Sequence, residues 1–373
     1  MSAEFASQSA KQLRGVNLGG WLVLEKWMTP SLFDGLNARD ETSWCVELGS
    51  EAQTRLKRHW RNFITRADFA WLAEIGINAV RIPVGYWLFG ADYPHHHSFG
   101  ASRYPFIVGG VDILDSAFDW AEEFGLRIVV DLHAAPGCQN GFDNGGIQDV
   151  CEWHTQEAYI DYSLETLERL ARRYGKRGAL HGIQVLNEPR WDLGTDLLRR
   201  YTTAAYGRIR CYCPPERVAV VFHDGFRSFR EYAGFLQPPE HSNVIFDIHR
   251  YQCFVPEDVD RDIYQHLQKV VCDWKAEADE IICELGLPTY VGEWSLGLDA
   301  KIAALWAQGP FDHTDSEMGD LQFNIACRGY AAAQLAVFEK YLGWFFWSYK
   351  TETMPQWSFR ECVERGWLPA RFA

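Results

Sequence analysis

Two glutamates stand at the ends of short apolar segments, and their chemistry is the clearest signal in the sequence. Glu188 ends the segment Gly182-Ile-Gln-Val-Leu-Asn-Glu-Pro189, and Glu293 lies in Thr289-Tyr-Val-Gly-Glu-Trp-Ser295. Each apolar run predicts a β-strand that carries its glutamate at the carboxyl end. Carboxyl ends of parallel barrel strands meet at one mouth, so we expect the two carboxylates to face each other there.

A pair of carboxyl groups across one opening suits cleavage of a glycosidic bond. One protonates the leaving oxygen, while the other attacks the anomeric carbon or activates a water. An isolated Asn-Glu-Pro can simply end a strand, but Trp191 and Trp294 flank the pair and Trp347 ends the last predicted strand. Indole rings stack on the apolar face of a pyranose, so the sequence favours a sugar over a phosphate.

Arg81, His133 and His249 also end predicted strands. A zinc site on the two histidines lacks a local His-x-His or His-x-x-x-His array that would supply a third neutral ligand. The triplet His95-His96-His97 superficially resembles one, but it follows Tyr93-Pro94 in a polar loop. We therefore predict no metal. Arg81 and the histidines instead suit a hydrogen-bonded shell that keeps one carboxylate ionised while the other holds its proton.

Strand-like and helix-like segments alternate along the chain, which is typical of repeated βα units around a parallel sheet. Eight strands are predicted: Arg14–Asn17, Ala79–Pro83, Arg127–Leu132, Gly182–Leu186, Val218–Phe222, Val244–Ile248, Thr289–Gly292 and Trp344–Trp347. The best amphipathic helices are Arg66–Ile75 (preceded by Thr65 as a cap), Val111–Phe124, Gln156–Tyr174, Asp196–Ile209, Asp262–Glu284 and Leu321–Tyr341.

These elements predict an α/β fold, one (β/α)8 TIM barrel spanning residues 1–373, with residues 1–12 as a flexible N-terminal extension. No linker tract or short repeat divides the chain. In such a barrel the functional side chains follow the strands. The predicted strand ends carry many polar or ring residues: Asn17, Arg81, Asp131, His133, Asn187, Glu188, His223, Asp224, Asp247, His249, Glu293 and Trp347.

Composition limits the classes of partner. Fifty acidic and 36 basic side chains give a formal charge of −14, which disfavours nucleic acid as a partner. No run approaches the roughly 18 apolar residues of a membrane span. The first 13 residues contain no apolar signal region, so a cytoplasmic location is expected, or a secreted one if a leader has been removed.

The ten cysteines include no Cys-x-x-Cys pair, and we expect most of them to be buried thiols. Cys211 and Cys213 are a weak candidate for a metal or redox role. Cys138 and Cys151 bracket a loop rich in glycine and asparagine, and the sequence leaves open whether an oxidising compartment would join them.

The motifs together resemble glycoside hydrolase family 5, and within it the exo-β-1,3-glucanases of the fungal type. The resemblance covers nearly the whole chain. It is carried by Arg14-Gly-Val-Asn-Leu-Gly-Gly-Trp-Leu-Val-Leu-Glu25, Asn78-Ala-Val-Arg-Ile-Pro-Val84, Asp131-Leu-His-Ala-Ala-Pro-Gly137, Gln139-Asn-Gly-Phe-Asp-Asn144, Asn187-Glu-Pro189, His249-Arg-Tyr251, Val291-Gly-Glu-Trp-Ser295 and Phe346-Trp-Ser-Tyr-Lys-Thr-Glu352.

The resemblance implies a retaining mechanism without a cofactor, in which Glu188 is the acid/base and Glu293 the nucleophile, with the two carboxyls about 5 Å apart. It also implies that a β-glucoside or β-glucan is the substrate. The implied binding residues are Arg81 and Tyr251 around the nucleophile, Asn187 for the sugar 2-hydroxyl, His133 and His249 in the same subsite, Trp347 as its floor, Glu25, Asp143 and Asn144 for the terminal hydroxyls, and Phe142 with Phe254 as an aromatic clamp.

Some residues depart from the family pattern and leave the leaving group open. They are Ala134, Cys138, Gly145-Gly146 and Arg250, around the predicted rim. The open substrates are a β-1,3-glucan chain, a short β-glucoside, a diglycoside, and a glycolipid or steryl glucoside. A non-catalytic carbohydrate-binding barrel is a rival that the presence of both glutamates disfavours, and Phe142-Asp143-Asn144 argues against an open-cleft cellulase or mannanase.

Overall fold

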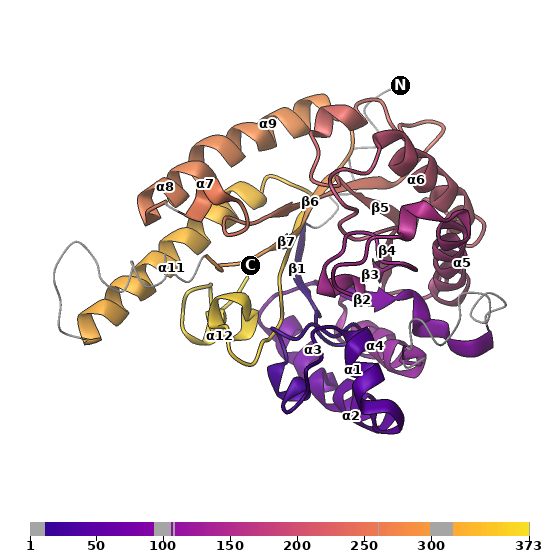
Figure 1. The fold of residues 1–373 in the computed structure, drawn as a ribbon. Helices are drawn as coiled ribbons and strands as arrows, with labels where there is room; N and C mark the ends of the chain where they lie inside the picture. The colour runs from indigo at the N-terminus through magenta and orange to yellow at the C-terminus, as the bar shows by residue number, and fades with distance from the viewer. Residues whose placement is uncertain (1–11, 93–105, 107–108, 260, 299–315, 373) are drawn as a thin grey trace.

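Eight parallel strands close into a barrel in the computed structural model, which describes residues 12–92, 106, 109–259, 261–298 and 316–372. Each strand pairs with the next one along the chain, and β8 pairs with β1 through Leu13 and Gly343 (Figure 1). The predicted (β/α)8 barrel is confirmed. The strands are β1 Leu13–Asn17, β2 Ala79–Gly85, β3 Arg127–Ala134, β4 Leu180–Gln184, β5 Ala219–His223, β6 Val244–Arg250, β7 Thr289–Trp294 and β8 Gly343–Phe346.

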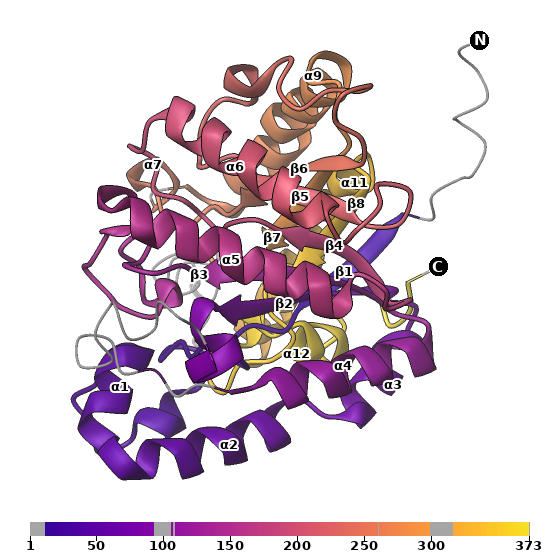
Figure 2. The same cartoon turned by 90° about the vertical axis from the view of Figure 1, so that its right-hand side faces the viewer.

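Helices surround the barrel (Figure 2). Five of the predicted helices are found as α3 Arg66–Glu74, α4 Val111–Phe124, α5 Glu157–Tyr174, α6 Thr195–Arg210 and α11 Ser316–Phe338. The predicted helix Asp262–Glu284 is a continuous run of three elements, which are α8 Ile263–Gln268, the π-helical η7 Lys269–Trp274 and α9 Lys275–Glu284. Thr65 caps α3, and its backbone N–H donates to the Asp68 carboxylate at 2.8 Å.

Within the described ranges, the prediction missed four helices: α1 Glu41–Leu48, α2 Ala52–Phe63, α7 Pro256–Val259 and α12 Phe359–Glu364. Short 3-10 turns lie at Pro30–Phe33, Gly49–Glu51, Tyr86–Asp92, Asp143–Gly145, Trp153–Thr155, Phe229–Tyr232 and Pro355–Trp357. In α2 the buried stripe includes Ala52 and His59 as well as Leu56 and Trp60. A helical period carried by alanine and histidine is difficult to see in a count of apolar residues.

The inward face of the barrel changes from apolar to polar along each strand, and this change builds the site. Val129 packs in the barrel interior with Ala79 and Ile245. Because side chains two residues apart share a strand face, Arg81, Asp131 and His133, and Asp247 and His249, continue the same inward rows toward the carboxyl ends. The outward positions pack against the helices.

Strand lengths decide how firmly the candidate side chains are held. β3, β6 and β7 extend beyond their predicted ends, so His133, His249 and Glu293 lie inside the sheet. β4 instead ends at Gln184, and Glu188 follows in a loop with a left-handed φ of 40°. A non-glycine residue in that conformation is strained, and such strain is most often found at functional sites.

Two sequence predictions fall on residues outside the described part of the chain. The His95-His96-His97 triplet lies wholly outside it. Of the proposed N-terminal extension, only Gln12 is described, and its side chain donates to the carbonyls of Glu339 at 2.8 Å and Tyr341 at 3.2 Å. Within the described ranges, none of the helices combines the length and apolar character needed to cross a bilayer.

All ten cysteines are free thiols, so Cys138 and Cys151 are not bridged in this structure. The buried Cys138 thiol lies 3.4 Å from Oδ1 of Asn140 and accepts the Gly141 N–H at 3.3 Å. The exposed Cys211 and the buried Cys213 lie at the end of α6, where each thiol donates to a helix carbonyl. These contacts are those of ordinary structural thiols.

Candidate active site

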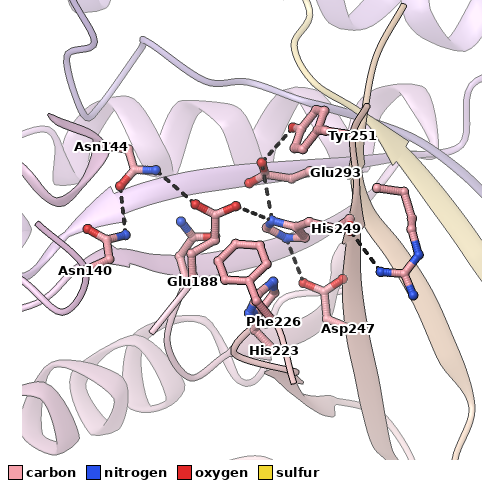
Figure 3. Close-up of polar contacts among 12 residues, drawn as sticks. Asn140, Asn144, Glu188, His223, Phe226, Asp247, His249, Tyr251 and Glu293 are labelled. Carbon is pink, nitrogen blue, oxygen red and sulfur yellow. Dashed lines mark hydrogen bonds and ion pairs between the residues drawn. The ribbon is translucent and has the colours of Figure 1, made fainter. Parts of the chain in front are cut away.

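Glu188 is held by two hydrogen-bonding partners at the barrel mouth (Figure 3). Its Oε1 lies 2.7 Å from Nδ1 of His249, and its Oε2 accepts Nδ2 of Asn144 at 3.2 Å. Asn144 is oriented in turn by Asn140, whose Nδ2 donates to its Oδ1 at 3.0 Å. The carboxyl is almost fully buried.

Glu293 faces Glu188 from β7 and has a different set of partners. Arg81 Nη1 donates to Oε1 at 2.9 Å, and the Tyr251 hydroxyl donates to Oε2, also at 2.9 Å. The β7–β8 register shifts between Val291 and Trp294. This irregularity lets Glu293 face inward beside the inward-facing Gly292.

His249 also limits the separation of the two carboxylates. Its Nδ1 is 2.7 Å from Glu188 Oε1 and 3.5 Å from Glu293 Oε2. The two oxygens therefore lie at most 6.2 Å apart, the sum of these distances. Facing oxygens this close are compatible with the roughly 5 Å between the carboxyl groups of a retaining pair.

The pKa values of the three groups are coupled through His249. Burial alone would raise the pKa of Glu188, but the hydrogen bond and charge of His249 lower it below its ordinary value. Burial and the charge of Glu188 raise the pKa of Glu293, against the lowering effects of His249 and Arg81. Burial would lower the pKa of His249, but Glu293, Asp247 and Glu188 raise it well above its usual value.

The pKa values of the two carboxyl groups therefore move apart, as the sequence predicted, with that of Glu188 lowered and that of Glu293 raised. The His249 ring hydrogen-bonds to Glu188 and is the group that lowers the pKa of this proposed acid. Glu188 and His249 together form one titrating unit. The predicted shell of Arg81 and His249 is present around the two carboxyl groups.

Arg81 joins the groups behind the two glutamates. Besides Glu293, it donates through Nη2 to Asn187 Oδ1 at 2.7 Å and forms a 3.0 Å ion pair with Asp131. This leaves Nδ2 of Asn187 buried and without a partner among the described residues. A free amide donor beside the catalytic pair is suited to a sugar hydroxyl.

His133 and Trp347 form a second wall of the site. The two rings stack at 5.3 Å with an interplanar angle of 6°. Nδ1 of His133 lies 2.6 Å from Asp131 Oδ2, and its Nε2 has no partner in the described part of the chain. Trp347 packs on Met28 and Trp357, which gives it the support that a ring platform needs.

Two further carboxyl groups, those of Glu25 and Asp143, lie at the same end of the barrel. Burial raises the pKa of Glu25 well above its ordinary value, and the charges of Asp143, Glu293 and Glu188 add to the effect. Burial also raises the pKa of Asp143. The charges of four carboxyl groups therefore act on one another at this end of the barrel, and the sequence predicted that Glu25 and Asp143 bind the terminal sugar hydroxyls.

Some of the predicted aromatic residues are exposed at the rim of the site, and others are buried in the protein core. Phe254 is 71% exposed and Phe142 is 47% exposed, and Phe254 packs edge-to-face on Tyr251 at 5.4 Å. Trp191 is also exposed. The expectation that Trp294 flanks the sugar site is wrong, because Trp294 is fully buried against Trp344, Phe346 and Phe338 on the outer face of the strand.

Sequence reasoning missed several residues that hold the site together. Gln139 donates to the carbonyls of His133 and Asn187 and so ties two of the site-bearing segments together. Gln184 accepts from Arg81 and donates to Asp247. The available signal was a glutamine inside the otherwise apolar strand Gly182-Ile-Gln-Val, because a polar residue inside a strand needs a buried partner.

The potential metal ligands gather elsewhere than expected. Among the described residues, Glu188, His223 and His249 bring three ligand atoms within 4.8 Å of one another, whereas the histidine pair considered from the sequence was His133 and His249. The Gly225 N–H donates to Nδ1 of His223 at 2.9 Å. The hydrogen of a neutral His223 is then on Nε2, which makes that nitrogen a donor and a poor metal ligand.

We expect Asp224→Asn to stabilise the protein at pH 8 but not at pH 4.5. Burial raises the pKa of Asp224 to about 7. Because this folded value exceeds the unfolded one of about 3.9, stability falls as pH rises from about 4 to about 7, and asparagine removes that loss. Thermal melts at the two pH values should separate the variant from the wild type by several degrees at pH 8 only.

Asp161→Asn, at an exposed position of α5, is the matched control and should follow the wild type at both pH values. An Asp224→Asn variant that melts with the wild type at pH 8 would contradict the buried-acid assignment.

Comparison with known proteins agrees with this geometry. A model of the family "Cellulase (glycosyl hydrolase family 5)" matches residues 45–353. The chain is 36% identical to a glucan 1,3-beta-glucosidase of Candida oleophila, over 96% of this chain and 88% of that protein. It is 34% identical to a probable glucan 1,3-beta-glucosidase A of Aspergillus niger, over 96% and 87%.

Among solved structures, the rutinosidase from Aspergillus niger shares the fold with a TM-score of 0.75 at 21% identity, over 95% of this chain and 97% of that one. The Thermotoga maritima Cel5A structure with cellobiose has a TM-score of 0.56 at 15% identity, over 95% and 97%. These likenesses show the fold. On the family match and the close sequence relatives, the chain belongs to glycosyl hydrolase family 5 and is a retaining glycoside hydrolase.

Proposed function

We propose that this enzyme releases glucose from the non-reducing end of β-1,3-glucans. The observation that carries the proposal is the convergence of Glu25 and Asp143 with the catalytic glutamates. A cleft for internal cleavage must stay open on both sides, whereas we infer that these two buried acids close the side where further sugars would continue. The relatives that are named glucan 1,3-beta-glucosidases support the same linkage.

The reaction takes two steps on the two glutamates. In the first, Glu188 gives a proton to the glycosidic oxygen while an oxygen of Glu293 bonds to the anomeric carbon and the leaving group departs. In the second, Glu188 takes a proton from water, the water oxygen bonds to the same carbon, and the ester to Glu293 breaks. Arg81 and Tyr251 hold the nucleophile in line.

The unpartnered polar atoms beside the pair bind the sugar. We assign Nδ2 of Asn187 to the 2-hydroxyl, where hydrogen bonds strengthen in the transition state. Nε2 of His133 faces a further hydroxyl, and Trp347 provides the floor on which the ring stacks. Phe142 and Phe254 stand at the entrance as aromatic surfaces for the next sugar.

A cavity lies beside β5 and β6. It has a volume of about 470 Å³ and is lined by residues that include Phe226 and Arg250, and Phe226 stands near the His223 ring at 5.0 Å. The Arg250 guanidinium is paired with Glu277 at 2.9 Å and lines this cavity. Neither Glu188 nor Glu293 lines this cavity, so a role of Arg250 toward the leaving group stays a prediction.

A substrate panel tests the proposal. The panel contains an aryl β-glucoside, laminari-oligosaccharides, cellobiose, a rutinoside, glucosylceramide and a steryl glucoside. We expect glucose as the first product from the laminari-oligosaccharides, initially as the β-anomer, with kcat/KM at least tenfold above that for cellobiose. Release of a disaccharide from the rutinoside, with the laminari-oligosaccharides untouched, would instead make the enzyme a diglycosidase. Reaction with the lipid glucosides alone would point to a glycolipid or steryl glucosidase.

A further inference from the structure

A third carboxylate lies directly beneath the catalytic pair and has no role in the scheme above. Asp247 precedes His249 by two residues in β6, so both side chains point into the barrel. It is 1% exposed. Figure 3 shows it at the ring nitrogen of His249 that faces away from Glu188.

The neighbouring strand β7 leaves space for the Asp247 carboxylate at Gly292. A Cβ at Gly292 would stand 2.1 Å from Oδ1 of Asp247 and 2.5 Å from its Oδ2. Gly292 does not have a left-handed φ, so glycine is needed there for space and not for backbone conformation. The residue before the nucleophile is therefore the one that makes room for this carboxylate.

The hydrogen-bond directions around Asp247 follow from Arg81. Arginine only donates, so its Nε fixes the Oε1 of Gln184 as an acceptor at 2.8 Å. The amide nitrogen of Gln184 then donates to Asp247 Oδ2 at 2.7 Å, and the same oxygen lies 3.3 Å from Nε2 of His249. An ionised carboxylate only accepts, so Nε2 of His249 carries a hydrogen.

We propose that Asp247 is a positioning residue that keeps a hydrogen on Nε2 of His249 and thereby makes His249 and Glu188 share one transferable proton. The proton passes from Nδ1 of the imidazolium to Glu188 along their 2.7 Å hydrogen bond. Glu188 gives it to the glycosidic oxygen as that bond breaks, and it regains a proton from the attacking water. The inference rests on the proposed role of Glu188.

The groups that face His249 determine the proton affinity of this pair. His223 packs against the ring at 4.2 Å, and burial lowers the pKa of His223 well below its usual value, so it adds no charge. Three carboxylates face the ring: Glu188 after β4, Glu293 from β7 and Asp247 from β6. Two arginines lie close to it. Arg81 contacts Glu293, and Nη1 of Arg250 donates to the His249 carbonyl at 3.1 Å. Removing Asp247 removes one of three carboxylates that retain the proton.

The pH dependence of kcat/KM in Asp247→Asn tests the proposal. Asparagine has the shape of aspartate and keeps an acceptor oxygen, but it carries no charge. The alkaline limb of the kcat/KM profile should therefore move to lower pH by at least about one unit. A purely structural role would lower kcat without moving that limb. Asp131→Asn is the control, because Asp131 is also a buried carboxylate two residues before a histidine of the site, although it contacts Nδ1 of His133 instead of Nε2. The alkaline limb of this variant should stay near that of the wild type. An unmoved limb in folded Asp247→Asn overturns the proposal.

A measurement on the wild-type protein covers the case in which Asp247→Asn does not fold. Histidine ¹⁵N NMR, with His249 assigned by comparison with His249→Gln, should show Nε2 protonated on both sides of the alkaline limb, with Nδ1 titrating. A neutral His249 that carries its hydrogen on Nδ1 overturns the proposal. The Glu188→Ala variant separates the two possible failures. If its loss of activity does not depend on the leaving group, the proposed function itself has failed. If that loss depends on the leaving group but the alkaline limb of Asp247→Asn is unmoved, only this inference has failed.

Discussion

Glu293→Gln is expected to lower kcat/KM on every substrate by at least about 10⁴-fold, which corresponds to about 5.5 kcal/mol of transition-state stabilisation. Glutamine has the size of glutamate, so Arg81 and Tyr251 keep their neighbour. The neutral amide, however, cannot form the glycosyl ester. Steady-state kinetics with an aryl β-glucoside measures the loss, and unchanged circular dichroism excludes unfolding.

The smaller variant Glu293→Ala identifies the role by stereochemistry. It leaves space for azide on the face of the sugar that the nucleophile attacks, so azide should give an α-glucosyl azide from an activated aryl β-glucoside. A product in the β configuration would place the nucleophile elsewhere and would contradict the assignment of Glu293.

Glu188→Ala should give a loss that depends on the leaving group. A dinitrophenyl glucoside departs without a proton, so its first step should stay within about tenfold of wild type, whereas an alkyl glucoside or laminaribiose should lose about 10³-fold or more. The second step also loses its base, and the glucosyl-enzyme should therefore accumulate as a burst in stopped-flow absorbance.

Azide again provides the control for Glu188. It attacks the accumulated ester without needing a base, so it should restore turnover of the dinitrophenyl substrate and yield a β-glucosyl azide, opposite to the product of Glu293→Ala. An equal loss on all leaving groups, with no azide effect, would show that Glu188 is not the acid/base.

The positions of the two glutamates were predictable because they depend on local pattern. An apolar run followed by a polar residue marks the end of a barrel strand, and all eight runs are strands whose ends differ from prediction by a few residues at most. The helix that contains His59 and Trp60 was harder to predict, because part of its buried stripe is polar.

Other features depend on which residues meet in space, and a linear pattern does not contain that information. Trp294 is next to Glu293 in sequence, but the alternation of a strand sends its ring to the opposite face, into the core. The thiols of Cys138 and Cys151 are free although their spacing allowed a bridge.

The sequence by itself determined the barrel, the family and the placement of two glutamates at the barrel mouth, because strand periodicity and short motifs are local properties. Only the tertiary structure decided which groups surround these glutamates and shift their pKa values. That depends on His249 lying 2.7 Å from Glu188 and 3.5 Å from Glu293, and on Gly292 leaving space for Asp247. These contacts join strands far apart in the chain, and in a buried site the electrostatic energy is set by such distances.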